Sequence, residues 1–171
     1  LQNQKWVGHN TDGKGFLYAL THFAKIPIKN KRIAIIGAGG SAKAIAVTLA
    51  SQNIHSLSII NRSPERLEAL TKHLHTKTPT TIIHPLTLND PDLEQHLTDC
   101  DIVIQTTPLG MTGAAVASLP LPTMNWAHHN HHCIDIIYSP AKTRFLQEAE
   151  QRGAGILNGQ AMLAGQAVLA F

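Results

Sequence analysis

The chain has 171 residues, which is enough for one domain with a hydrophobic core. Hydrophobic residues make up 43% of it and charged residues 15%, a balance that excludes a disordered chain. The net charge of +3 comes from scattered basic residues, and no apolar run reaches the roughly 20 residues of a membrane span, so we expect no nucleic acid and no membrane as partners.

Short apolar runs alternate with helical patterns along the chain. Strands are predicted at residues 31–37, 56–61, 80–84, 101–107, 133–138 and 154–159, and helices at 41–53, 64–74, 90–98, 142–153 and 160–171. The strands are continuously apolar, as in a parallel sheet that is covered on both faces. The sequence therefore predicts an α/β fold, a doubly wound parallel six-stranded sheet in the order 3-2-1-4-5-6, flanked by helices.

Another helix is predicted before the first strand, in residues 8–25. Thr11 or Asp12 would cap it, and its apolar residues would share one face: Phe16, Leu17, Leu20 and Phe23. The sheet does not require this helix. We interpret it as a bridge from a domain that precedes this chain.

A glycine motif, Gly37-x-Gly39-x-x-Ala42, follows the first strand and opens the next helix. Gly37 permits a tight turn, Gly39 lets the backbone reach a pyrophosphate, and the small Ala42 lets the helix pack against the strand. The N–H groups at the helix N-terminus would face the anion. The motif predicts a dinucleotide site, and a glycine turn without a ligand is the alternative.

The second strand ends without the acid that usually binds the adenine ribose. In its place stand Asn61 and Arg62, with Arg66 one helical turn further on and Ser63 between them. Two cations on one helix face match a 2′-phosphate, so we predict a preference for NADP(H). The alternative is a solvated helix start in which the arginines pair with Glu65 and Glu68.

Histidines and cysteines are candidates for a metal site and for reactive thiols. The stretch "AHHNHH" (127–132) lacks a carboxylate at a fixed spacing and precedes the fifth strand, so we expect a solvated loop and no metal site. Cys100 and Cys133 form no CxxC pair, which favours free structural thiols and a cytoplasmic location.

Six motifs occur in an order that resembles the shikimate dehydrogenase family: "GHNTDGKGF" (8–16), "GAGGSAKA" (37–44), "NRSPER" (61–66), "DIVIQTTPLGM" (101–111), "DIIYSPAKTRFL" (135–146) and "NGQAMLAGQA" (158–167). This family uses NADPH to reduce 3-dehydroshikimate to shikimate in aromatic amino acid biosynthesis. The resemblance therefore implies an oxidoreductase with a Rossmann domain over residues 1–171.

The resemblance also implies roles for individual residues. Asp12 matches the family's catalytic carboxylate, which also binds substrate, and Tyr138 and Gln166 match substrate contacts near the nicotinamide. Contacts to NADP(H) are implied for a larger set: Gly37, Ala38, Gly39, Gly40, Ser41, Ala42, Asn61, Arg62, Ser63, Arg66, Thr106, Thr107, Met111 and Gly159.

The chain departs from the family pattern at four positions, where Gln105, Thr106, Asn158 and Ala161 replace the usual Asn, Ala, Asp and Gly. The family's N-terminal substrate domain, with its catalytic lysine, has no counterpart in the chain, and Lys14 points another way on its helix. We therefore expect this chain to bind NADP(H) but to turn over little or nothing. The shikimate substrate would bind together with the missing domain.

Two other functions stay open at this point. One is an NAD-using quinate/shikimate dehydrogenase, which an acid at the end of the second strand would have favoured. The other is a non-catalytic nucleotide-binding module, which would need none of Asp12, Tyr138 and Gln166. The sequence leaves self-association into an oligomer open.

Overall fold

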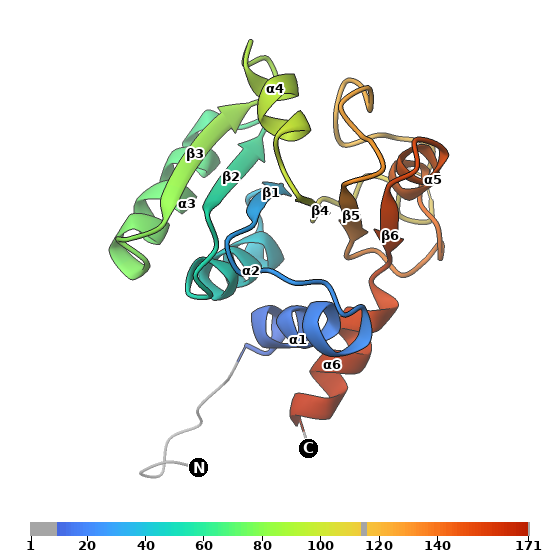
Figure 1. The fold of residues 1–171 in the computed structure, drawn as a ribbon, viewed down its shortest axis with the longest axis horizontal. Helices are drawn as coiled ribbons and strands as arrows, with labels where there is room; N and C mark the ends of the chain where they lie inside the picture. Colours follow the sequence, from blue (N-terminus) through green and yellow to red (C-terminus); the bar gives the residue numbers. More distant parts are fainter. Residues whose placement is uncertain (1–9, 114–115, 171) are drawn as a thin grey trace.

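The structure, a computed structural model, describes residues 10–113 and 116–170. Its strands pair in parallel to form one sheet in the order β3-β2-β1-β4-β5-β6. The strands are β1 (Arg32–Ile36), β2 (Ser56–Asn61), β3 (Ile82–Thr87), β4 (Ile102–Gln105), β5 (His132–Asp135) and β6 (Gly155–Leu157). The predicted doubly wound fold is confirmed (Figure 1).

Helices cover both faces of the sheet. The helices are α1 (Asp12–Tyr18), the π-helix η1 (Ala19–Phe23), α2 (Gly40–Ala50), α3 (Pro64–Lys77), α4 (Leu93–Thr98), α5 (Arg144–Gln151) and α6 (Gln160–Ala170). Strand β1 alternates between two cores: Ile33 and Ile35 pack with α1, α2, α3 and α6, while Ala34 and Ile36 pack with α4 and α5. Burial on both faces explains why the strand is apolar at every one of these positions.

Strand β3 begins and ends later than predicted, and it continues through Pro85. Proline cannot donate a backbone hydrogen bond, so a proline in a strand is tolerated mainly at a sheet edge. β3 is an edge strand, and its residues Ile82 and Pro85 are exposed. The prediction for residues 80–84 was therefore misplaced.

The helix before β1 forms, but its apolar face differs from the predicted one. Phe16 and Leu20 are buried, whereas 51% of Phe23 is exposed. In η1 the Ala24 N–H donates to the carbonyl of Ala19, five residues earlier. This wider turn rotates the last residues away from the face that a regular α-helix would give them. The placement of Phe23 on the apolar face was wrong.

The histidine stretch lies before and at the start of β5, at the end of the sheet opposite the glycine loop, but it is only partly solvated. His131 is 1% exposed. Its Nδ1 accepts from the His128 N–H (3.0 Å), so Nε2 carries the proton that it donates to the Leu97 carbonyl (3.1 Å). Burial, followed by the nearby His128, lowers the pKa of His131. The prediction of a solvated loop was wrong for this residue.

Cys100 and Cys133 are free thiols in the core that α4 and α5 cover. Burial raises the pKa of each thiol to about 12, so both stay protonated and unreactive at neutral pH. Within residues 10–113 and 116–170, no cluster of three or more His, Cys, Asp or Glu side chains could hold a metal. The same residues contain no helix long and apolar enough for a membrane span.

Candidate cofactor and substrate site

The glycine loop joins the end of β1 to α2 and is fixed to the neighbouring strands. Gly37 has a φ angle of +118°, and a Cβ atom there would lie 2.4 Å from Thr106 Oγ1. Its N–H donates to the Ile60 carbonyl (2.8 Å), and the Thr106 N–H donates to the Ile36 carbonyl (2.9 Å). Only glycine fits this turn, as the sequence motif predicts.

Gly39 and Gly40 have a different environment. A Cβ atom at either position would meet no protein atom within 4 Å, so protein packing does not require these glycines. The space in front of them lies at the N-terminus of α2, where Gly39 is the N-cap residue and no side chain caps the helix. Unpaired N–H groups at such a terminus favour an anion, and a pyrophosphate fits this position. Ala42 is fully buried and packs in the core, as expected.

Hydrogen bonds shape the turn between β2 and α3. Asn61 donates from Nδ2 to the Ser63 carbonyl (3.0 Å), and the N-cap residue Ser63 accepts from the Arg66 N–H. Ser63 also donates to the carboxylate of Glu65 (2.8 Å). Together with the backbone N–H of Glu65, this bond lowers the pKa of that carboxyl.

Arg62 and Arg66 are exposed at this turn. Among the described residues, neither guanidinium has a carboxylate within ion-pair distance. Glu65 bonds to Ser63, and among the described residues neither Glu65 nor Glu68 pairs with an arginine, so the pairing that the alternative assumed is absent there. Both cations are available to an anion that approaches the end of β2.

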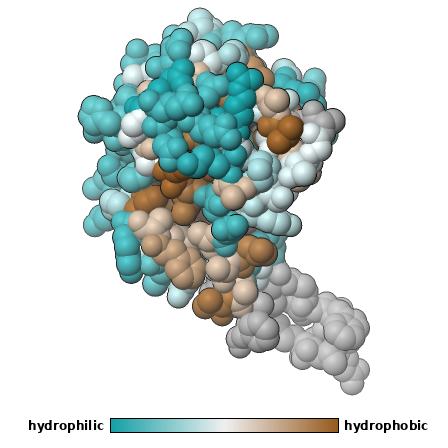
Figure 2. Space-filling model, turned by 90° about the vertical axis from the view of Figure 1, so that its right-hand side faces the viewer, coloured by the Kyte–Doolittle hydropathy of each residue, from teal (hydrophilic) through white to brown (hydrophobic). Residues whose placement is uncertain are grey.

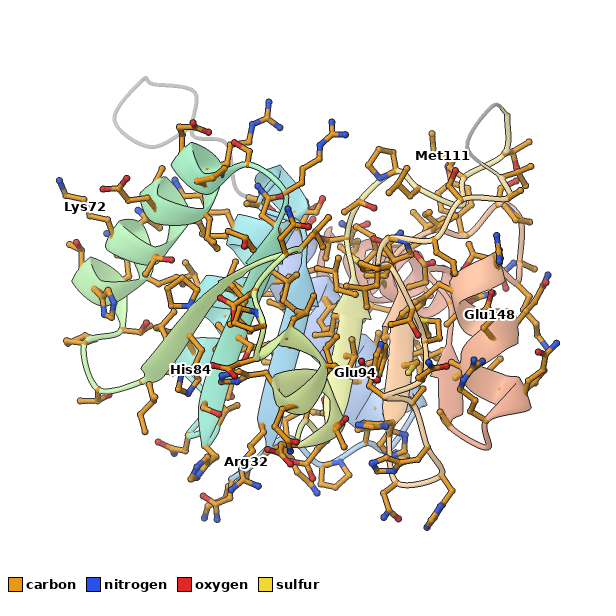
Figure 3. The ribbon with its side chains drawn as sticks, turned by 90° about the horizontal axis from the view of Figure 1, so that it is seen from above. Arg32, Lys72, His84, Glu94, Met111 and Glu148 are labelled. Atoms are coloured by element: carbon orange, nitrogen blue, oxygen red, sulfur yellow. The ribbon has the colours of Figure 1, made fainter. Side chains whose placement is uncertain are left out.

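A cavity of about 510 Å³ opens beyond β4 and β5. Its lining includes four residues predicted from the sequence, namely Thr106, Thr107, Met111 and Tyr138. Met111 is 50% exposed and Tyr138 is 56% exposed. Figure 3 shows Met111 at the edge where the strands end and Arg32, at the start of β1, at the opposite edge. The cavity therefore lies at the edge where open α/β sheets bind ligands.

Gln105 holds the wall of this cavity, a role that the sequence did not reveal. Its buried side-chain amide donates to the carbonyls of Thr107 (3.0 Å) and Leu109 (2.8 Å), and its carbonyl oxygen accepts from the Thr107 N–H. In the sequence, Gln105 stands out only as a departure from the usual Asn. The one sign of this role in the sequence is a longer amide side chain at the end of a buried strand.

Asp135 fixes the segment that carries Tyr138. Its buried carboxylate accepts from the Ile137 N–H (2.9 Å) and from the Thr143 hydroxyl (2.7 Å). Thr143 is also the N-cap residue of α5. Burial raises the pKa of Asp135 to about 6, although the two hydrogen bonds oppose this shift. The carboxylate is thus a buried anchor for the loop and does not face the cavity opening.

Asp12 joins three distant parts of the chain. Its Oδ1 accepts from Gln166 Nε2 on α6 (2.7 Å), and its Oδ2 accepts from Ser41 Oγ on the first turn of α2 (3.3 Å). Two donors fix the orientation of the carboxylate beside the phosphate end of α2. The structure therefore brings together two of the predicted substrate-binding residues and one predicted cofactor residue.

Close packing of two helices makes this cluster feasible. A Cβ atom on Gly15 would lie 2.6 Å from Gln166 Cγ, and one on Gly165 would lie 2.4 Å from the Gly15 carbonyl oxygen. α1 and α6 cross in close contact at this point (Figure 1). Packing also requires glycine at position 159, which is predicted to contact cofactor. A Cβ atom added at Gly159 would lie 2.0 Å from the Ile136 carbonyl oxygen.

These features define a class of protein, a Rossmann-type dinucleotide-binding domain with a polar cluster beside its phosphate loop. The sequence profile of the shikimate/quinate 5-dehydrogenase family matches residues 19–112. The chain belongs to this family.

Known proteins resemble the chain over nearly all of its length. The NADP(+) shikimate dehydrogenase of Desulforamulus reducens is 40% identical over 169 residues, which are 99% of this chain and 57% of that protein. The shikimate 5-dehydrogenase of Listeria monocytogenes, solved with shikimate and NAD, superposes with a TM-score of 0.88 at 31% identity, covering 95% of this chain and 57% of that one.

A shikimate dehydrogenase solved with NADP+ superposes with a TM-score of 0.84 at 33% identity, covering 99% of this chain and 57% of that one. The chain thus spans a little over half the length of the relatives that it matches.

Proposed function

We propose that this chain is the NADP(H)-binding part of a shikimate dehydrogenase, an oxidoreductase that interconverts 3-dehydroshikimate and shikimate. The observation that carries this proposal is the hydrogen bond between Asp12 and Gln166 beside the glycine loop. A module that only binds nucleotide has no use for this paired carboxylate and amide. Family membership and relatives named as NADP(+) enzymes support the assignment.

Different residues of the chain would bind different parts of NADP(H). The N–H groups at the start of α2 and the open space at Gly39 and Gly40 fit the pyrophosphate, and Arg62 and Arg66 fit a 2′-phosphate. When bound, the nicotinamide supplies the hydride. The cavity lined by Thr106, Thr107, Met111 and Tyr138 would take the reactive end of the cofactor and substrate.

Asp12 and Gln166 would hold substrate hydroxyl groups. The carboxylate accepts a hydrogen bond from a hydroxyl, while the Gln166 amide keeps its orientation fixed. Carbonyl reduction also needs a proton donor at the oxygen that gains charge. We assign this donor to the lysine of an N-terminal substrate domain, so the chain alone is catalytically incomplete.

The surface of α6 and η1 supports the need for a further domain. Phe23, Leu163 and Val168 are large apolar side chains that stand exposed on these two helices. Figure 2 shows apolar surface on the lower part of the molecule, where Figure 1 places α1 and α6. A substrate domain that follows the family pattern and precedes residues 8–25 would cover part of this surface. We place the whole protein in the cytoplasm.

A second candidate is an NAD-using quinate or shikimate dehydrogenase, since the Listeria relative was solved with NAD. The end of β2 disfavours it, because Asn61 and Arg62 offer no acid for the ribose hydroxyls.

The activity is tested in the protein in which the substrate domain precedes this chain, by following shikimate-dependent reduction of NADP+ and NAD+. We expect turnover with NADP+, and a loss on the order of 100-fold or more in Asp12→Asn with cofactor affinity unchanged. Full activity of Asp12→Asn, or faster turnover with NAD+, would overturn the proposal.

A further inference from the structure

A second hollow lies next to the predicted phosphate site. Its volume is about 170 Å³, and it runs between α2 and α3. Its lining residues are Ala38, Lys43, Arg66, Ala69, Leu70 and His73. This volume is well above the ~10–15 Å³ that one water molecule needs. That space suits a phosphate group and is too small for a whole dinucleotide.

The lining connects two parts of the proposed cofactor site. Ala38 belongs to the glycine loop, and Arg66 belongs to the cation pair at the end of β2. Lys43 stands on the first turn of α2, as Arg66 does on α3. Basic groups from two helices therefore border one hollow, whereas the sequence motif pointed only to the cations of α3 and the residues just before it.

The electrostatics of the hollow favour an anion. None of its lining residues is acidic. Burial, followed by the positive charges of Lys43 and Lys77, lowers the pKa of His73. Because burial disfavours a charge of either sign, only the contribution of the two lysines reflects a positive potential that would attract an anion. Within the described part of the chain, no carboxylate forms an ion pair with Lys43 or Arg66.

We propose that Lys43 binds the 2′-phosphate of NADP(H) from the α2 side and, with Arg62 and Arg66, determines the preference for NADP(H) over NAD(H). This inference rests on the proposed binding of NADP(H). It adds a specificity-determining residue that lies just after the Gly37-x-Gly39-x-x-Ala42 fingerprint and outside the "NRSPER" turn. Lys43 is exposed, so its side chain can be removed without opening the core.

The test is a titration of this chain with NADPH, NADH and adenosine 2′,5′-bisphosphate at about pH 8, where the phosphate is fully charged. Lys43→Ala is compared with Lys72→Ala, which removes the same charge from α3. Figure 3 shows Lys72 on the outer side of that helix, and it does not line the hollow. Lys43→Arg keeps the charge and is the conservative variant.

We expect Lys43→Ala to weaken NADPH and the bisphosphate by about 5- to 20-fold, as for a partly exposed charge-assisted contact. NADH affinity should change less than about 2-fold, Lys72→Ala should resemble the parent chain, and Lys43→Arg should keep most of the preference. Equal losses for NADPH and NADH would overturn the role in specificity.

The proposed function and this inference fail in different ways. If the parent chain prefers NADPH and Arg62→Ala removes that preference while Lys43→Ala behaves like Lys72→Ala, only the role of Lys43 is overturned. If the parent chain binds NADPH and NADH equally, the NADP assignment fails and the inference fails with it.

Discussion

Gln166 and Asp12 are 154 positions apart, yet the Gln166 amide donates to the Asp12 carboxylate at 2.7 Å. The bond joins α6, the last described helix, to α1, the first described one, next to the N-terminus of α2. Ser41 satisfies the other carboxylate oxygen. A carboxylate held from two sides has a defined direction, which is what a substrate-binding residue requires.

Gln166→Glu should destabilise the chain, because it would place two carboxylates within hydrogen-bond distance of each other. We expect a loss of about 1 kcal/mol in the free energy of unfolding at about pH 8. The loss should shrink at acidic pH, where the two groups share a proton. Urea unfolding at both pH values measures it, with Gln166→Met as the uncharged control. A pH-independent loss equal to that of the control would contradict the account.

Gly15→Ala should open the crossing of α1 and α6, since its Cβ atom would lie 2.6 Å from Gln166 Cγ and 2.8 Å from the Gln166 backbone nitrogen. Overpacking of this kind costs about 1–3 kcal/mol. Thermal unfolding should show a lower Tm. An unchanged Tm would mean that the two helices do not approach this closely.

Unlike Gly15→Ala, Gly40→Ala should leave the stability of the chain intact and weaken cofactor binding. No protein atom lies within 4 Å of its Cβ position, and alanine favours a helix, so we expect the Tm to stay the same or rise. The methyl group would instead occupy the space that we assign to the pyrophosphate, and NADPH affinity should fall about 10-fold or more. If the NADPH affinity of the variant equals that of the parent chain in a fluorescence titration, the pyrophosphate binds elsewhere.

The burial of His131 makes stability depend on pH. Its pKa is lowered in the folded chain, so the unfolded chain binds the proton more tightly. The free energy of unfolding should therefore fall as the pH drops below about 6.5, the ordinary histidine value. Denaturant unfolding across this range should show a smaller fall in His131→Gln than in the parent chain. His129→Gln, which changes an exposed neighbour, should leave the slope unchanged.

Asp135 gives the free energy of unfolding the opposite dependence on pH. Its pKa is raised to about 6 from an ordinary value of about 3.9, so the folded chain binds this proton more tightly than the unfolded chain. Its contribution to stability is full at low pH and is lost as the pH rises from about 4 to 6. Asp135→Asn should remove this loss, because an amide keeps the acceptor for the Ile137 N–H without a charge. Identical pH profiles for variant and parent would contradict the shift.

Local patterns were sufficient to predict the sheet, its order and the glycine turn. β1 and β2 are short, mostly buried strands with clear ends, and Gly37, Ser63 and Pro64 mark the turns and caps that follow them. Such signals depend on residues close in the sequence, which is why they can be read without a structure.

Other features depend on contacts between distant segments. The exposure of Phe23 follows from one wide helical turn, and the buried His131 ring bonds to Leu97 on α4, 34 residues earlier. Lys43 borders the phosphate side only because α2 lies beside α3. A single sequence carries no direct sign of these pairings, so the prediction missed them or placed them wrongly.

The central claim is that the cations after β2 hold a 2′-phosphate, and the most direct test is to titrate this chain with NADPH and NADH while following nicotinamide fluorescence. We predict an affinity for NADPH that is about 10- to 100-fold higher than for NADH, and a clear loss of this preference in Arg62→Ala. Equal affinities for the two cofactors, or an Arg62→Ala variant that keeps the full preference, would contradict the account.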